Sequence, residues 1–195
     1  MHTLARRLGL LLVGCLVLGT GVGMLLSADL GSDGYSTFVN GLALTLDVPF
    51  WVVNLVVGTV LVVLAAFRGV RPGVGTIAQV VGVGVVISVL LAWWSTPDGL
   101  VGRSVLLVVA FPVLAAGLAA YLGSNTGAGP AEAAALAWDP PVPFKWSYSL
   151  VQGGGAIGGY VLGATVGVGT IAVVLALGPL VDLSSRLMRL DVHQT

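Results

Sequence analysis

Long apolar stretches separated by short polar segments run through the whole chain. About 20 apolar residues in a helix span the hydrocarbon core of a bilayer, and six stretches approach that length. They are Leu8–Leu26, Phe50–Phe67, Gly73–Trp94, Ser104–Leu122, Trp146–Thr165 and Val168–Leu183, the last of which can continue to Met188. The pattern predicts an all-α, polytopic membrane protein with about six transmembrane helices.

The composition strengthens this prediction and excludes several classes of protein. Hydrophobic residues make up 57% of the chain and charged residues only 8%, whereas a soluble domain carries about 25% charged residues. The net charge is zero, which argues against nucleic acid as a partner. With one cysteine and no sequence motif for a zinc site, a haem, a phosphate-binding loop or a catalytic triad, we expect neither an enzyme nor a cofactor or metal site.

The first apolar stretch also has features of a segment that is removed after synthesis. Arg6-Arg7 before an apolar run is typical of a signal peptide, and Leu12–Cys15 fits a lipoprotein cleavage pattern. The run continues beyond Cys15 to Leu26, however, where a lipoprotein would have a polar tether. We therefore expect the segment to be retained as a transmembrane helix.

The basic residues predict the orientation of the helices, because cytoplasmic loops are enriched in Lys and Arg. With the N-terminus in the cytoplasm, only Arg103 lies outside. The inner side receives Arg6, Arg7, Arg68, Arg71, Lys145, Arg186 and Arg189. This bias requires an even number of crossings and predicts six spans, with both termini cytoplasmic.

Three segments of the first half recur in the second half in the same order. Gly73–Ala78 recurs letter for letter as Gly167–Ala172, Val48–Phe50 recurs as Val142–Phe144, and Gly21…Gly31 matches Gly117…Gly127, which pairs Asp29 with Asn125. The chain is therefore predicted to be one transmembrane domain, 1–195, with repeats at 8–94 and 104–188. Three spans in each copy force opposite orientations, an arrangement that is usual in secondary transporters.

Each predicted repeat contains a glycine-rich break that is followed by a short helix. The breaks are Ser27–Gly34 and Gly123–Pro130, and the short helices cover 34–46 and 130–138. Such helices are too short to span. They are either re-entrant half-helices, whose breaks meet around a polar or anionic group, or ordinary loops with interfacial helices, and the sequence leaves both alternatives open.

The polar residues near these breaks and inside the spans are the candidates for a solute pathway. They are Asp29, Asp33, Asn125, Glu132, Gln152 and Asp182. Asp182 either couples a proton or pairs with Arg186 one turn later. Asn54, Gln79 and Tyr148 are expected to form interhelical hydrogen bonds, and Gly154, Gly158, Gly159 and Gly163 to form a close packing face.

Short motifs give the chain a resemblance to a known family. Ala28–Gly31, Gly127–Pro130, the two Gly-Val-Gly-Thr turns and Gly178–Leu183 resemble the bacterial YczE/YyaS/YitT-type membrane proteins. The resemblance implies a polytopic plasma-membrane protein without a settled activity. It also implies an acid at the third position of each short helix, which Glu132 supplies in the second copy and Ser36 does not in the first.

These features favour a small-solute transporter whose site lies at the interface between the repeats. The alternative is a membrane scaffold that supports a partner enzyme through cytoplasmic residues such as Arg68, Arg71 and Lys145. A channel would need a continuous polar path, which so few polar residues disfavour. The expected partners are the lipid bilayer and an unidentified small solute, and the sequence leaves open whether the chain forms a homo-oligomer.

Overall fold

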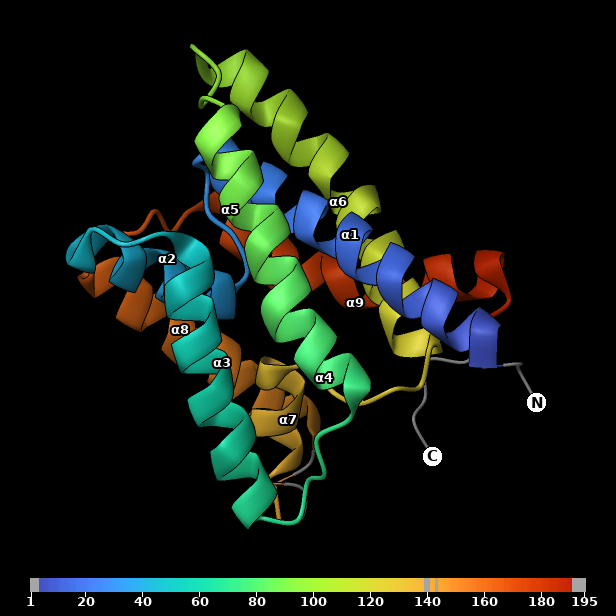
Figure 1. Ribbon diagram of the computed structural model, residues 1–195. Coiled ribbons are helices and arrows are strands. Elements are labelled where there is room, and N and C mark those ends of the chain that lie inside the picture. The colour runs from blue at the N-terminus through green and yellow to red at the C-terminus, as the bar shows by residue number, and fades with distance from the viewer. Residues whose placement is uncertain (1–3, 139–140, 143, 191–195) are drawn as a thin grey trace.

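The computed structural model describes residues 4–138, 141–142 and 144–190, and this part of the chain is helical, without strands (Figure 1). The elements are α1 (Leu4–Ala28), α2 (Gly34–Leu46), α3 (Phe50–Phe67), α4 (Val74–Ala78), η1 (Gln79–Val83), α5 (Gly84–Trp93), α6 (Leu100–Gly123), α7 (Pro130–Leu136), α8 (Phe144–Val161) and α9 (Val168–Met188). Both halves of the chain therefore have the same order: a long helix, a short helix and two further long segments.

Four helices in the described residues are long and apolar enough to cross a membrane: α1, α3, α6 and the continuous run α4–η1–α5. A fifth candidate is α9, which bends by 50° between Val168–Leu177 and Pro179–Met188. α8 is not among them, because polar residues and a run of glycines lower its hydropathy. The chain is thus a multi-pass membrane protein, and four to five helices in the described residues have the length and hydropathy of a membrane span. The predicted set of six is not confirmed.

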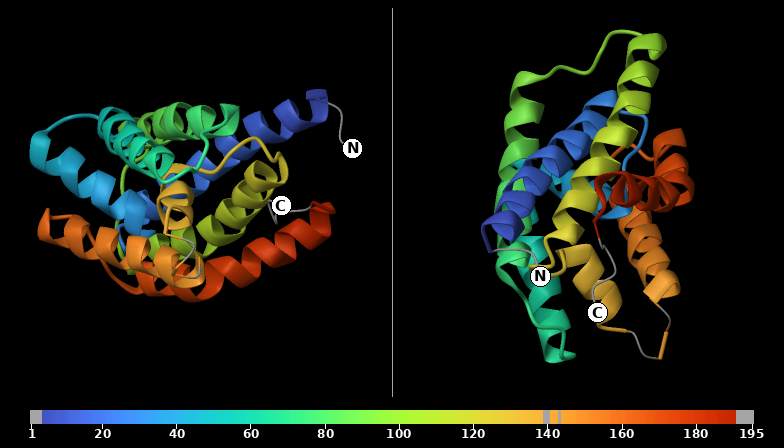
Figure 2. Two further views of the ribbon diagram at one scale, coloured as in Figure 1. Left: turned by 90° about the horizontal axis from the view of Figure 1, so that it is seen from below. Right: turned by 90° about the vertical axis from the view of Figure 1, so that its right-hand side faces the viewer.

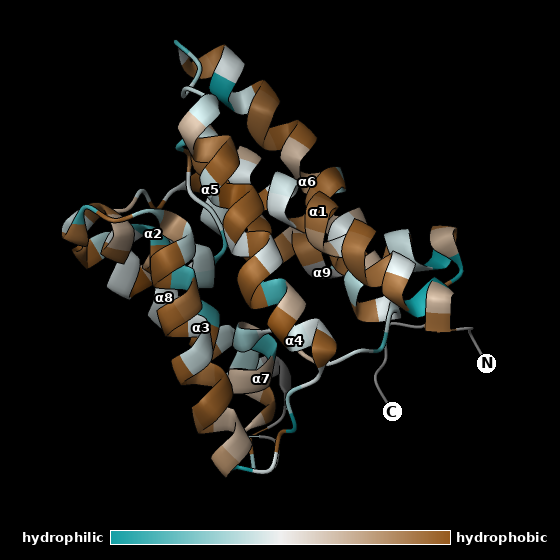
Figure 3. Ribbon diagram, in the orientation of Figure 1, coloured by the Kyte–Doolittle hydropathy of each residue, from teal (hydrophilic) through white to brown (hydrophobic). Residues whose placement is uncertain are grey.

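Hydrophobic residues, coloured brown in Figure 3, occur along all the long helices, and many of their large side chains are exposed. Val56 and Leu64 on α3 and Val89 on α5 each expose more than half of their surface. Water would penalise such a surface, whereas lipid tails accept it. The exposed surface therefore supports the same assignment as the helix lengths.

The long helix of each half packs along its counterpart, α1 against α6, and the two halves form adjoining layers (Figure 2, left). A Cβ atom on Gly21 would lie 2.7 Å from the backbone nitrogen of Leu114, and one on Gly117 would lie 2.6 Å from Cα of Leu18. Only glycine fits at these two crossings, which is how small residues let membrane helices approach closely.

The short helices pack across the halves, α2 on α8 and α7 on α3. In α8 the close-packed glycines are Gly155, Gly158 and Gly159, which face α2. The prediction that Gly154 and Gly163 share this face is wrong, because a Cβ on either would meet no neighbouring atom within 4 Å. Gly163 instead has φ +88°, which suits the turn after α8 and explains why that helix ends before Thr165.

Each glycine-rich break docks on the start of a long segment in the other half. The backbone N–H of Gly169 donates to the carbonyl of Leu30 at 2.8 Å, and that of Gly75 donates to the carbonyl of Thr126 at 2.9 Å. Gly75 and Gly169 occupy the same place in the two copies of the Gly-Val-Gly-Thr sequence. The letter-for-letter repeat is therefore a docking surface for the breaks.

Two arginines bind the carbonyls that α1 and α6 leave unpaired at their C-terminal ends. Arg103 donates from Nε to the carbonyl of Ala28 at 2.9 Å and from Nη2 to that of Asp29 at 3.0 Å. Arg7 makes the corresponding bonds to the carbonyls of Ser124, at 2.9 Å, and Asn125. A cation at a helix C-terminus also interacts favourably with the helix dipole.

A π-helical turn, η1, interrupts the run from α4 to α5. Such turns insert one residue into a helix and leave backbone carbonyls without their usual partner. Here the carbonyl of Val80 accepts a hydrogen bond from Nδ2 of Asn54 on α3, at 2.6 Å. The side chain of Gln79, the first residue of the turn, borders a buried cavity.

Candidate functional site

A cavity of about 60 Å³ lies between helices of both halves. One part of its wall is apolar and includes Leu18, Ile87, Leu114 and Leu118. Residues from α2, α3, η1, α7 and α8 make up the polar part. The polar side chains are those of Asp33, Tyr35, Ser36, Asn54, Gln79, Glu132, Tyr148 and Gln152.

Asp33 brings a carboxylate to the cavity from the first half. It is the N-cap residue of α2, and its Oδ2 accepts a hydrogen bond from the backbone N–H of Ser36 at 2.9 Å. Aspartate is favoured at this place because the first N–H groups of a helix lack backbone partners. The cap occupies one carboxylate oxygen, whereas the buried Oδ1 has no hydrogen-bond partner.

Glu132 brings a second carboxylate from the other half, in the first turn of α7. Pro130 begins that helix, a position where its missing N–H costs nothing. The carboxyl group of Glu132 shares a hydrogen bond with the hydroxyl of Tyr148 on α8. Its buried Oε2 has no partner.

The neighbouring polar side chains fix one another by hydrogen bonds. Gln152 donates from Nε2 to the Tyr148 hydroxyl at 2.8 Å and accepts at Oε1 from the backbone N–H of Tyr35 at 3.1 Å. The Tyr35 hydroxyl donates in turn to Oδ1 of Asn54 at 2.9 Å. A network of this kind joins α2, α3, α7 and α8 and holds the polar wall in one geometry.

Three buried acceptor oxygens on this wall therefore remain unpaired: Oδ1 of Asp33, Oε2 of Glu132 and Oε1 of Gln79. No Lys, Arg or His lines the cavity within the part of the chain that the structure describes. Buried carboxyl groups are stable together only when protons or a bound cation compensate their charge. The cavity can thus accept hydrogen-bond donors and positive charge.

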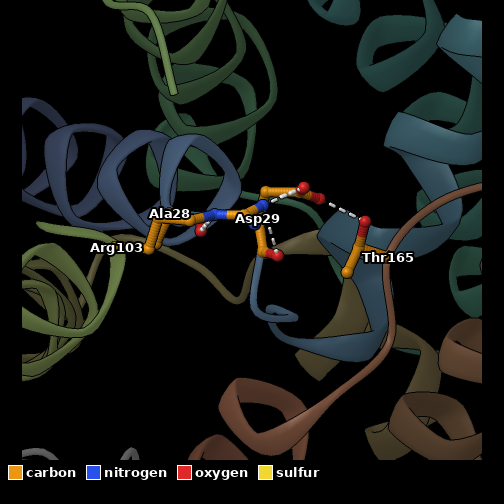
Figure 4. Close-up of polar contacts among 4 residues, drawn as sticks. All are labelled: Ala28, Asp29, Arg103 and Thr165. Carbon is orange, nitrogen blue, oxygen red and sulfur yellow. Dashed lines mark hydrogen bonds and ion pairs between the residues drawn. The ribbon is translucent and has the colours of Figure 1, made fainter. Parts of the chain in front are cut away.

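Of the residues that the sequence singled out, Asp33, Glu132 and Gln152 lie together at this cavity. Asp29 does not. Its carboxylate forms an ion pair with Arg103 and accepts a hydrogen bond from Thr165 (Figure 4). It borders a second hollow near the end of α1.

Asn125 also lies away from the cavity. It occupies the left-handed turn after α6, with φ +49°, where its carbonyl accepts the hydrogen bond from Arg7. Asp182 lies on α9, and its side chain is outside the described residues. The two alternatives for Asp182, coupling of a proton and pairing with Arg186, therefore stay predictions.

Gly31 and Gly127, the glycines at the centre of the two breaks, do not line this cavity. Gly31 packs against Thr170 and Gly127 against Thr76, at the two docking surfaces. The ends of the breaks converge instead, since Asp33 and Pro130 both line the cavity, together with Glu132 just after the second break. Sequence reasoning missed Tyr35, for which no signal stood out, and assigned Asn54, Gln79 and Tyr148 only to helix contacts.

The loop residues that the scaffold hypothesis uses are partly engaged within the chain. The guanidinium carbon of Arg68 lies 4.2 Å from the centre of the Trp138 ring, a cation–π contact between the ends of α3 and α7. The side chain of Lys145 is outside the described residues. Arg71 is exposed.

A protein-family model matches residues 5–186, and its description is a family of unknown function, DUF6198. The chain belongs to this family. An uncharacterized protein of Haemophilus influenzae is 24% identical over 182 residues, which cover 91% of this chain and 82% of that protein. No solved structure matches the chain. The narrower likeness to YczE/YyaS/YitT-type proteins rests on the short motifs alone.

Proposed function

We propose that this DUF6198 protein is a transporter of the bacterial plasma membrane that moves a small solute through the cavity bordered by Asp33 and Glu132. In this proposal six segments cross the membrane, with α8 and the bent α9 completing the set, and both termini face the cytoplasm. The apolar outer surface and the bias of basic residues support that topology.

Contacts that occur twice support two inverted copies. Gly21 and Gly117 each meet a leucine of the other long helix, and Arg7 and Arg103 each bind the end of the opposite one. The members of each pair are 96 residues apart. Two halves that are related by a twofold axis are expected to make equivalent contacts in this reciprocal way. If each half has three spans, the halves have opposite orientations and the axis lies in the membrane plane.

The observation that carries the proposal is the cavity itself. Buried polar atoms are almost always paired, so three unpaired acceptor oxygens around one hollow need an explanation. A ligand that donates hydrogen bonds supplies it. The two carboxylates come from different halves, so a tilt of one half against the other would change access to the cavity and break the site apart, as alternating access requires.

A transport assay tests the proposal directly. Purified full-length protein in proteoliposomes is expected to accelerate uptake or efflux of at least one solute from a panel of small cationic, neutral and anionic metabolites. Asp33→Asn and Glu132→Gln should each reduce that rate at least about tenfold, since hydrogen bonds to a charged group contribute about 1.5–3 kcal/mol. Asp47→Asn is the matched control, because Asp47 is exposed at the end of α2.

The proposal fails if no solute moves, or if transport is unchanged in both cavity variants. In that case the scaffold hypothesis becomes the better account, and crosslinking at Arg71 should capture a partner. The topology has its own test: an impermeant maleimide should label Asp98→Cys in intact cells and should not label Arg71→Cys. Equal labelling of both would contradict the predicted orientation.

A further inference from the structure

We propose that the cavity binds the ammonium group of a small organic amine. This names the solute class of the transporter and in that respect rests on the proposed function. Three features of the cavity support it: the number of unpaired acceptor oxygens, the charge of its lining and the apolar side chains in the same lining.

The number of acceptors matches an ammonium group. A primary ammonium carries three N–H donors and no acceptor. The polar wall offers three buried oxygens without partners, on Asp33, Glu132 and Gln79. Gln152 is already engaged with Tyr148 and with the backbone N–H of Tyr35, and the Tyr35 hydroxyl with Asn54. The wall therefore has acceptors to offer and few donors.

The charge of the lining selects a cation. Asp33 and Glu132 lie at the same cavity, and within the described residues no basic side chain borders it. Arg7 and Arg103, on the two long helices, bind the C-terminal ends of α6 and α1 instead. An anionic solute would meet two carboxylates without compensation and would be repelled.

The ligand set and the apolar wall favour an organic cation over a divalent metal ion. No group of three or more His, Cys, Asp and Glu side chains in the described part of the chain could hold a metal, and divalent cations prefer six or more oxygen ligands or a closed N/S shell. Leu18, Leu114 and Leu118 line the same cavity. These side chains suit a short hydrocarbon body, which a bare ion lacks.

Binding to the detergent-purified full chain tests the inference with ethylammonium as the probe. The melting temperature is measured at neutral pH, where a primary amine is protonated, against sodium chloride of equal ionic strength. Ethylammonium should raise the melting temperature in a saturable way, and the dose dependence gives an apparent Kd. Tetramethylammonium, which has no N–H donor, acetamide and sodium acetate should not raise it.

The cavity variants show where the probe binds. Asp33→Asn and Glu132→Gln should each weaken the apparent Kd for ethylammonium by about 10- to 100-fold, whereas Asp47→Asn should stay within about twofold. Each Kd is fitted against the variant's own melting temperature without ligand, so that a change in stability does not imitate a loss of binding. The inference is overturned if the melting temperature is insensitive to ethylammonium, if tetramethylammonium or sodium ions act equally, or if the cavity variants bind as the parent protein does.

The binding and transport experiments together distinguish a failure of the amine-binding inference from a failure of the transporter proposal. If ethylammonium binds through Asp33 and Glu132 but no amine crosses the proteoliposome membrane, transport is refuted and the inference stands. If a neutral or anionic solute is transported in a Glu132-dependent way and ethylammonium does not bind, transport stands and the inference is refuted.

Discussion

Replacing Gly159 by alanine tests the close packing of α8 on α2. A Cβ atom at this position would lie 2.6 Å from the carbonyl carbon of Thr37 and 2.8 Å from the backbone nitrogen of Phe38. Both are backbone atoms, which cannot turn aside as a side chain can. Overpacking typically costs about 1–3 kcal/mol, which outweighs the gain of about 0.5–1 kcal/mol from a better helix former.

Gly153 provides a matched control on the same helix. A Cβ atom there meets nothing within 4 Å, so Gly153→Ala gains the helix propensity without a clash and should be neutral or slightly stabilising. Since about 1 kcal/mol changes the melting temperature of a chain of this size by about 2–4 °C, Gly159→Ala should melt roughly 2–12 °C lower than the control.

The single cysteine makes the measurement simple. Cys15 is 5% exposed in the folded chain, so a thiol-reactive dye in detergent reports unfolding when it reaches this residue. Because α2 begins at the Asp33 cap, displacing α2 should also weaken whatever binds the cavity. Equal melting temperatures for Gly159→Ala and Gly153→Ala would refute the reasoning, because they would mean that α2 and α8 are not in close contact here.

Two further pairs of substitutions should differ in how much stability they cost. The first pair compares equivalent threonines in the two halves, and the second compares the two partners of one ion pair. Thr76→Val should cost about 1–2 kcal/mol, because its hydroxyl donates to a carbonyl at 2.7 Å and accepts from a backbone N–H at 3.1 Å. Thr170→Val should be nearly neutral, because the buried hydroxyl of Thr170 has no partner; similar losses in both melting curves would contradict this. Arg103→Gln should destabilise by about 1 kcal/mol or more, because two backbone carbonyls lose their donor. Asp29→Asn should cost less, since the ion pair is partly exposed, and a double-mutant cycle on the melting temperatures measures the coupling.

The helices were the most predictable part of the fold, because hydropathy is a local property of the sequence. The sequence-based range for α3, Phe50–Phe67, agrees with the structure at both ends. The bend of α9 was not predicted, although Pro179 interrupts that helix and is the kind of residue that causes such bends. The glycine face of α8 was misassigned because glycines fill positions 153–155 and 158–159, so that composition alone does not select a face.

The candidate site was predictable only in part, because its geometry depends on contacts between distant segments. The repeated Gly-Val-Gly-Thr turns were visible in the sequence, but nothing local shows that they bind the breaks around Leu30 and Thr126. The family resemblance places the acid of the first copy at position 36, where this chain has Ser36. The acid of the first half is instead Asp33, which caps the same helix and so reaches the same cavity.

The exchange of arginine caps between the halves has a consequence for biogenesis. The ribosome synthesises α1 long before Arg103, the residue that binds the carbonyls of Ala28 and Asp29. Until α6, the fourth span, enters the membrane, the end of α1 lacks that partner and Arg7 lacks the carbonyls of Ser124 and Asn125. Neither half can mature by itself, so a chain truncated before Arg103 should be a substrate for membrane proteases even though all its apolar spans have been inserted.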